Sequence, residues 1–265
     1  MSHTPRNEDE RHHFPGPGTL DRAVRLVRFL RDNCPWDAEQ TAESLIPHLL
    51  EETHEVIDAI RGGSPEEVEG ELGDLLLNLA FQIVVAEESG TMDSATVYAR
   101  LEQKMIRRHP HLFGEGERQS WELLKAAERT AGESVLSGMA KGLDPLTKSY
   151  RIQERVAAVG FDWEDYEGAW QKVDEELEEV REAVESGDTE AVQEEIGDLL
   201  FAAVNLARLA GPHPTTALNR ANTKFQSRFE RLEQLALERG IRVENAGLEV
   251  LDGLWDEVKQ EEASR

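Results

Sequence analysis

Carboxylate side chains recur in this chain at a spacing suited to holding a metal ion. Glu52 and Glu55 form one pair three residues apart, and Glu71 and Asp74 form another. Residues at this spacing lie on one side of a helix, about one turn apart. The short connection at 62–65 favours antiparallel neighbouring helices, so the two pairs can face each other. Four anions so close would raise one another's pKa unless a cation neutralised them, and oxygen ligands of this kind suit Mg²⁺.

The same carboxylates occur a second time, 124 residues further along and without a gap. They are Glu176 and Glu179, followed by Glu195 and Asp198. A tryptophan-containing segment precedes each copy, and a basic pair spaced i, i+4 follows each copy. The basic pairs are Lys104 with Arg108 and Lys224 with Arg228. Duplication of one helical unit explains this self-similarity.

The position of some of these carboxylates argues against ordinary surface acids. In a chain with 54 acidic residues, pairs at i, i+3 also arise on solvated helix faces, and we interpret most of them in this way. Glu52, however, interrupts an apolar stripe. Asp74 lies in a helix that is apolar nearly all round, as Asp198 does in the second copy, so we expect both to be buried. Because an unpaired buried carboxylate is costly, this favours a metal site over a structural role.

The basic pairs and the tryptophans suggest a ligand with phosphates and a base, but each also has an ordinary structural explanation. A cationic fork beside a bound metal would suit a polyphosphate, but such pairs are also ordinary surface residues. Three tryptophans could stack on a nucleobase or anchor a core: Trp36, Trp163 and Trp255. The sequence has no glycine-rich phosphate loop. A di-iron carboxylate bundle takes Glu-x-x-His ligands from two helices, and the second repeat has no such pair. A non-catalytic helical interaction protein with structural metal sites stays open as the alternative.

Composition limits the classes of partner. The 265 residues carry 54 Asp and Glu against 29 Lys and Arg, a formal charge of -25, which disfavours nucleic-acid and membrane-surface partners. The single cysteine, Cys34, excludes a disulfide framework and a Cys-based zinc site. No apolar run reaches the roughly 20 residues that a membrane span needs. Residues 1–18 are polar and lack a signal core, so we interpret them as a disordered lead-in to a cytoplasmic protein.

Helical periodicity dominates from about residue 20, and alternating strand patterns are nearly absent, so the sequence predicts an all-α fold. Ser64, Pro65 and Glu67 predict the capped start of one helix. Residues 34–37 are predicted to form a loop, with a longer helix after them. The expected organisation is a disordered segment at 1–18, helical domains at 19–131 and 146–262, and a linker at 132–145.

These motifs resemble the MazG family of nucleoside triphosphate pyrophosphohydrolases. The E-E-x-x-E and E-x-x-D signatures occur in both halves, at 51–55 with 71–74 and at 175–179 with 195–198. Further stretches are similar to the two-domain bacterial members: Cys34-Pro35-Trp36-Asp37, RRHPH at 107–111, VGFDW at 159–163 and the segment 197–208. The likeness covers about residues 20–259.

The resemblance implies paired antiparallel metal-binding helices, a homodimer, and Mg²⁺-dependent cleavage of a nucleoside triphosphate between the α and β phosphates, with Mn²⁺ able to substitute. It also implies housecleaning of the nucleotide pool. Water would attack the α-phosphorus, with Glu175 or Glu176 accepting its proton. The eight carboxylates named above become the metal ligands, and the C-terminal copy ranks first as the active one, whereas the spacing leaves both copies open. The implied nucleotide contacts are Lys224, Arg228 and Trp255, with Lys104 and Arg108 in the first copy.

Overall fold

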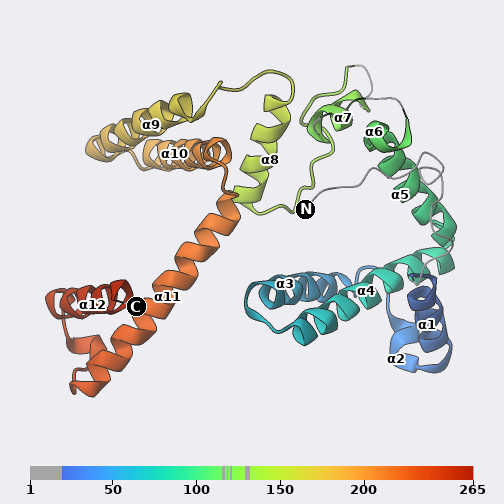
Figure 1. Ribbon diagram of the computed structural model, residues 1–265, viewed down its shortest axis with the longest axis horizontal. Coiled ribbons are helices and arrows are strands. Elements are labelled where there is room, and N and C mark those ends of the chain that lie inside the picture. Colours follow the sequence, from blue (N-terminus) through green and yellow to red (C-terminus); the bar gives the residue numbers. More distant parts are fainter. Residues whose placement is uncertain (1–19, 115–116, 118, 120, 129–131, 265) are drawn as a thin grey trace. The chain divides into compact units, whose positions relative to one another are not determined.

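The computed structural model describes residues 20–114, 117, 119, 121–128 and 132–264, so the disordered segment expected at 1–18 lies outside the described residues. Within the described ranges all regular elements are helices, which confirms the all-α prediction. The chain divides into two compact units, residues 1–119 and 120–265 (Figure 1). None of the described helices combines the length and the apolar character that crossing a membrane requires.

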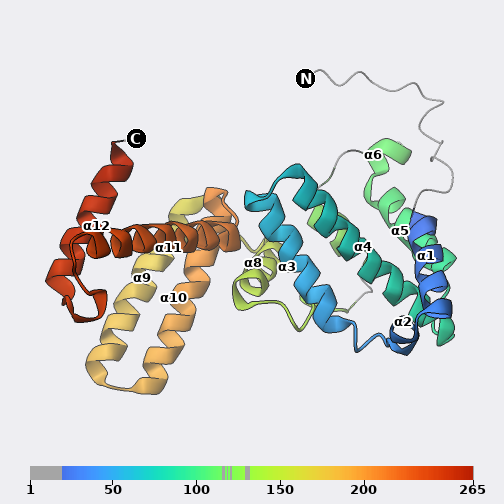
Figure 2. The same cartoon turned by 90° about the horizontal axis from the view of Figure 1, so that it is seen from below.

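The first unit is organised around the long helix α4. Its helices are α1 (Leu20–Asn33), α2 (Pro35–Glu39), α3 (Ile46–Gly62), α4 (Pro65–Glu88), α5 (Ser94–Arg108) and α6 (Pro110–Phe113). Helices α3 and α4 lie side by side, and α1 packs against the C-terminal part of α4 (Figure 2). The buried core of this unit consists of Val24, Val27, Leu45, Ala80, Phe81 and Val84.

Local signals set where these helices begin. The predicted capping box of α4 is confirmed, because Ser64 Oγ accepts a hydrogen bond from the Glu67 N–H at 3.2 Å and Glu67 Oε2 accepts one from the Ser64 N–H. The predicted loop at residues 34–37 is wrong. Pro35 is the first residue of α2, since its fixed φ suits the first turn of a helix. The next helix, α3, begins only at Ile46.

The second unit contains the helical hairpin of α9 and α10. Its elements are α7 (Trp121–Ala127), α8 (Pro145–Ala157), α9 (Tyr166–Ser186), α10 (Thr189–Ala210), α11 (Pro214–Glu238), the short 3₁₀ helix η2 (Val243–Asn245) and α12 (Leu248–Ala263). The hairpin turns at Gly187, whose φ of 74° suits glycine, and Asp188 caps the start of α10. The tight turn fixes α9 and α10 as antiparallel neighbours.

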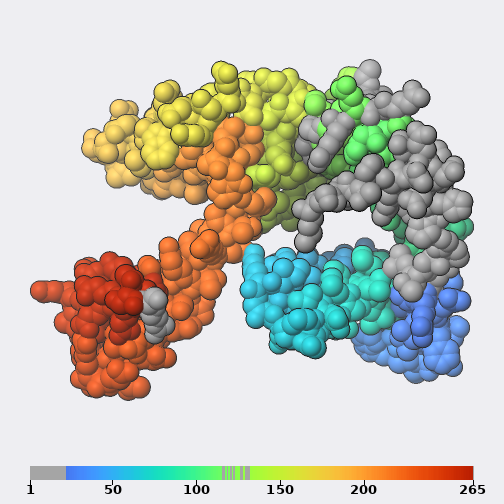
Figure 3. Space-filling model, in the orientation of Figure 1, coloured from blue at the N-terminus to red at the C-terminus, as the bar shows by residue number. Residues whose placement is uncertain are grey.

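A separate small core holds α12 against the C-terminal part of α11 (Figure 3, orange to red). It is formed by Leu232, Leu235, Ala236, Leu254 and Val258. Helix α7, which we expected in the first domain, falls in the second unit. The division between the units therefore lies before the linker predicted at 132–145, which stays a prediction.

Candidate functional site

Each half of the chain brings three of its four predicted metal ligands together. In the first unit these are Glu52 and Glu55 on α3 and Glu71 on α4, here called the N-terminal trio. In the second unit Glu176, Glu179 and Glu195, from α9 and α10, form the C-terminal trio. Within each trio one carboxylate oxygen per residue lies within 4.8 Å of the others. Side-by-side helices with ligands at i, i+3 produce this geometry, and three converging carboxylates are a donor set for a hard divalent cation.

The fourth carboxylate of each half behaves differently from our expectation. Asp74 and Asp198 are both exposed and lie outside the trios, so the prediction that they are buried is wrong. The reason is that a helix that is apolar nearly all round is not necessarily covered all round. Leu72 on α4 and Leu200 on α10 are themselves 48% and 56% exposed within this chain. Asp74 nevertheless lies close enough to contribute to the raised pKa of Glu52.

The C-terminal trio contains a buried oxygen that lacks a hydrogen-bond partner. Glu176 is only 3% exposed, and its Oε1 accepts a contact from Lys172 Nζ at 2.6 Å. Its Oε2 is buried and has no hydrogen-bond partner among the described residues. A buried carboxylate oxygen without a partner is costly, and a divalent cation is a partner that this donor set fits. The carboxylates of the C-terminal trio therefore fit a divalent metal ion.

A lysine lies at the edge of this trio. Lys172 Nζ donates to Glu175 Oε1 at 2.8 Å as well as contacting Glu176, and these two hydrogen bonds raise the pKa of the Lys172 ammonium well above its ordinary value. The pKa of Glu179 is also raised, by burial first and then by the charge of Glu176. The site thus combines one fixed cation with several carboxylates that repel one another.

The N-terminal trio has a different neighbour. His48 takes the position of Lys172 in the repeat, and its Nδ1 lies 3.9 Å from Glu51 Oε2, which is outside the range of a hydrogen bond. Burial first, and then the charges of Asp74, Glu55 and Glu71, raise the pKa of Glu52. Glu52 is half-buried rather than buried. The carboxylates are repeated, but within the described residues no lysine or arginine forms an ion pair with this trio as Lys172 does in the second unit.

Two of the predicted nucleotide-contacting residues, Arg228 and Trp255, lie beside each other. Arg228 donates to Glu262 Oε2 at 2.7 and 2.9 Å, and its guanidinium lies 6.0 Å from the centre of the Trp255 ring. Trp255 also packs against Phe225 at 5.1 Å. Lys224 is exposed, and none of the three predicted residues has a described contact with the C-terminal trio. The remaining basic pair, Lys104 and Arg108, lies on α5, outside both trios.

Comparison with known proteins agrees with this picture. The MazG nucleotide pyrophosphohydrolase domain matches residues 40–113 and 165–232. The chain is 39% identical over 259 residues to the nucleoside triphosphate pyrophosphohydrolase of Escherichia coli strain K12, covering 92% of this chain and 98% of the relative. It is 41% identical over 246 residues to the nucleoside triphosphate pyrophosphohydrolase/pyrophosphatase MazG of Thermotoga maritima, covering 91% and 95%.

This chain belongs to the MazG family. The resemblance inferred from the motifs is confirmed, as is the double occurrence of the domain. Each MazG match spans one complete set of four carboxylates, and the second also includes Lys172, Lys224 and Arg228.

Sequence reasoning missed three residues around the second MazG site. Lys172 precedes Glu176 by one helical turn, and this i, i+4 spacing is the signal that could have found it. Arg208 forms an ion pair with Asp162 and also donates to Asn205 Oδ1 at 2.9 and 2.7 Å. Asn205 and Arg208 are polar residues in the largely apolar helix α10, a signal that could have found them, and their contacts hold the loop before α9.

Proposed function

We propose that this chain hydrolyses nucleoside triphosphates to a nucleoside monophosphate and pyrophosphate, with Mg²⁺ held by the C-terminal trio. Family membership supports the reaction class. The observation that carries the choice of site is the buried Glu176 Oε2 without a partner, beside Glu179 and Glu195. Asp198 completes the proposed ligand set; it is exposed and lies about one helical turn after Glu195 on α10. The N-terminal trio with Asp74 is proposed as a second, weaker metal site.

Each residue of the proposed site has a separate role in the reaction. A bound divalent cation would offset the charge of the phosphate oxygens and acidify the attacking water. We assign Glu175 as the group that accepts the proton of the attacking water, because its carboxylate is exposed. Glu176 would instead be a ligand of the metal ion. Lys172 holds Glu175 in place through its hydrogen bond at 2.8 Å. The ammonium also reduces the field that Glu175 and the four carboxylates of the C-terminal ligand set would otherwise present to an anionic substrate.

We further propose that the enzyme is a homodimer. Exposed apolar side chains recur at equivalent positions on α4 and α10, and contiguous apolar surface of this kind marks an interaction site. They are Leu72 and Leu76 in the first unit and Ile196 and Leu200 in the second. A second copy seated here could bring its Lys224, Arg228 and Trp255 to the trio. Sedimentation analysis of Leu200→Glu should show loss of the dimer, and an unchanged dimer would rule out this surface.

We also propose housecleaning of the cytoplasmic nucleotide pool as the role, which membership of the MazG family supports. We propose no nucleic-acid or membrane partner, because the acidic composition disfavours both. A panel of nucleoside triphosphates with product identification tests the reaction directly. Pyrophosphate and monophosphate should form with Mg²⁺ or Mn²⁺ and not with a chelator. Release of inorganic phosphate alone would rule out cleavage between the α and β phosphates.

The site assignment is tested by matched glutamine variants. Glu176→Gln should abolish pyrophosphate release, whereas Glu52→Gln should leave most of it. Glu178→Gln is the control, because Glu178 is an exposed glutamate on the same helix that pairs with Arg181. Full activity in the Glu176→Gln, Glu52→Gln double variant would reject both trios, and loss in Glu52→Gln alone would reverse the ranking of the halves.

A further inference from the structure

The indole of Trp163 rests on the first turn of α9. A Cβ added to Gly168 would lie 2.2 Å from Trp163 Cδ1 and 2.7 Å from its Nε1, closer than non-bonded atoms approach. Glycine is therefore required at position 168 for the ring to lie there. Although it packs on the helix, Trp163 remains 43% exposed. One part of the ring is thus fixed against the backbone while another stays available to a ligand.

The loop that carries Trp163 is fastened to α10. Asp162 accepts from Arg208 Nη1 at 2.9 Å, and the same carboxylate accepts from the Trp163 N–H at 2.9 Å. Arg208 is itself oriented by Asn205 Oδ1, and Asn205 is buried. Since a bidentate guanidinium–carboxylate pair fixes direction as well as distance, the backbone at Trp163 has a defined position relative to α9 and α10.

The ring shares a helix face with the proposed metal site. Gly168, Lys172, Glu176 and Glu179 follow one another at i, i+4, i+8 and i+11, a spacing that keeps side chains on one side of a helix. Each step of four residues advances about 6 Å along the axis. The face therefore presents, in order, an aromatic ring, an ammonium group and the carboxylate trio. This is the order of chemistry along a nucleoside triphosphate, from the base to the phosphates.

We propose that Trp163 is the surface on which the nucleobase stacks in the C-terminal site. This inference rests on the proposed function, which places the phosphates at the trio. Aromatic stacking accepts every base because every base has a π-face, so such a contact predicts broad nucleotide use rather than a strict preference. Trp255 is the competing candidate, but its ring already packs against Phe225 and lies beside Arg228, and within one chain it does not lie on the helix face that carries Lys172 and Glu176.

Steady-state kinetics of the full chain with ATP test the proposal. Trp163→Leu should raise KM about tenfold with little change in kcat, because a lost stacking contact weakens binding without removing the reacting groups. Trp163→Phe, which keeps an aromatic face, should recover most of the affinity. Inorganic triphosphate, which has no base, should inhibit the wild type and Trp163→Leu equally. A purely structural role for Trp163 would weaken both ligands alike.

Two further variants provide a second test of the proposal and a control. Gly168→Ala displaces the indole without altering it and should also raise KM for ATP, so the proposal remains testable if Trp163→Leu fails to fold. Trp170→Leu removes an exposed tryptophan from another face of α9 and should leave the ratio of ATP to triphosphate affinity unchanged. An unchanged ATP KM in folded Trp163→Leu overturns the stacking proposal. Absence of activity in the wild type, or full activity in Glu176→Gln, would instead overturn the proposed function.

Discussion

The two halves of this chain repeat the same ligands in different surroundings. In the second half Glu176 is buried and touches the ammonium of Lys172, whereas in the first half Glu52 is half-buried and His48 stands where the lysine would be. Duplication of the carboxylates therefore does not by itself duplicate the site. The burial and the fixed cation distinguish the half that we expect to be catalytic.

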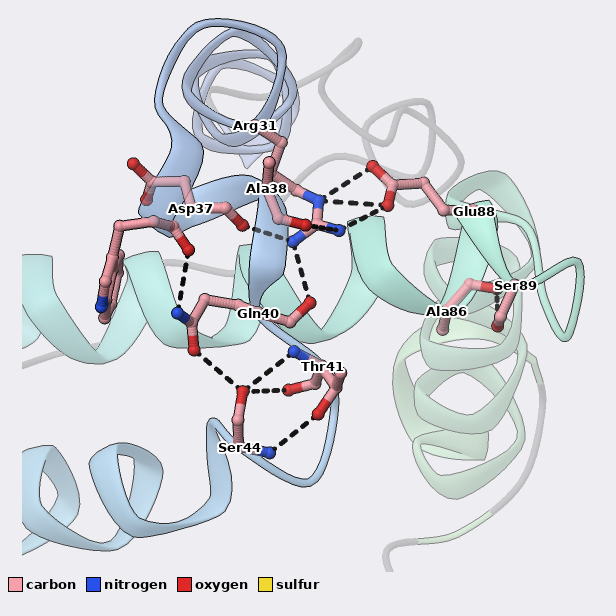
Figure 4. Close-up of polar contacts among 10 residues, drawn as sticks. Arg31, Asp37, Ala38, Gln40, Thr41, Ser44, Ala86, Glu88 and Ser89 are labelled. Atoms are coloured by element: carbon pink, nitrogen blue, oxygen red, sulfur yellow. Dashed lines mark hydrogen bonds and ion pairs between the residues drawn. The ribbon is translucent and has the colours of Figure 1, made fainter.

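The halves also differ in how they fasten their tryptophan segments. In the first half Arg31 on α1 donates to the carbonyl oxygens of Asp37 at 2.7 Å and Gln40 at 3.1 Å, and pairs with Glu88 at 2.7 Å (Figure 4). In the second half the fastening arginine is Arg208, on α10, the helix that also carries Glu195 of the C-terminal trio. Helix α10 thus supplies both Glu195 of the trio and the arginine that holds the loop, whereas in the first half the arginine comes from α1. The loop and the trio are therefore coupled there.

The largest expected difference between the halves lies in metal affinity. Titration of the chain with Mn²⁺ should reveal a tighter and a weaker site. Glu176→Gln should weaken the tighter one by at least about 100-fold, because even residues that only support metal ligands contribute 10- to 100-fold. Glu52→Gln should affect the weaker site alone. Two sites of equal affinity, or loss of the tight site in Glu52→Gln, would contradict the contrast drawn between the trios.

The two fastening arginines provide the next test. Arg208→Ala and Arg31→Ala should each lower the free energy of unfolding of their own unit by about 2 kcal/mol, because each leaves partly buried acceptors without a donor. Only Arg208→Ala should also raise KM for ATP, since it releases the loop that holds Trp163. Urea unfolding followed by hydrogen exchange in each unit separates the two effects on stability. A raised KM in Arg31→Ala would mean that the first half takes part in binding.

Much of this comparison could be predicted from spacing. The i, i+3 pairs and the exact shift of the repeat predict that Glu52, Glu55 and Glu71 converge, because helix geometry fixes which side chains share a face. The start of α4 follows from its capping residues, Ser64 and Glu67. Both depend on contacts within a few residues, which the local sequence determines.

What could not be predicted depends on contacts between distant parts of the chain. The apolar character of α4 and α10 does not say how many neighbours each helix has, so the exposure of Asp74 and Asp198 was misjudged. Arg208 binds Asp162, which is 46 residues away in the sequence, and the helical periodicity of the sequence does not predict that contact. The start of α2 was missed for another reason, because the proline that begins it was interpreted as part of a loop.

Exchanging the residues at the repeated position tests the role of the fixed cation. Lys172→His should lower kcat/KM about tenfold at a pH where imidazole is neutral, since a charge-assisted hydrogen bond is lost beside Glu175 and Glu176. His48→Lys, the reverse exchange in the first half, should leave turnover unchanged. Pyrophosphate release measured in both variants decides the matter. An active Lys172→His enzyme would show that the ammonium does not distinguish the two halves.

The smallest expected effect concerns an ion pair that only the first half has. Although burial opposes it, hydrogen bonds from Ser94 and Arg28 lower the pKa of Glu87 to about 2, from an ordinary value of 4.5. A folded-state pKa below the unfolded one stabilises the fold above about pH 4.5, and this contribution disappears as the pH falls towards about 2. Because the Arg28 side chain is 47% exposed, solvent screening reduces the contribution to about 1 kcal/mol.

Glu87→Gln should therefore destabilise the first unit by about 1 kcal/mol at pH 7, and the difference from the wild type should shrink steadily between pH 5 and about pH 3. Glu69→Gln, at an exposed position on the same helix, is the control and should show no such trend. The second unit has glycine, Gly211, at the position equivalent to Glu87, so its stability should follow pH without this component. Hydrogen exchange resolved by unit measures both at once. An equal pH-dependent loss in the two units would place the titrating group outside the α1–α4 contact.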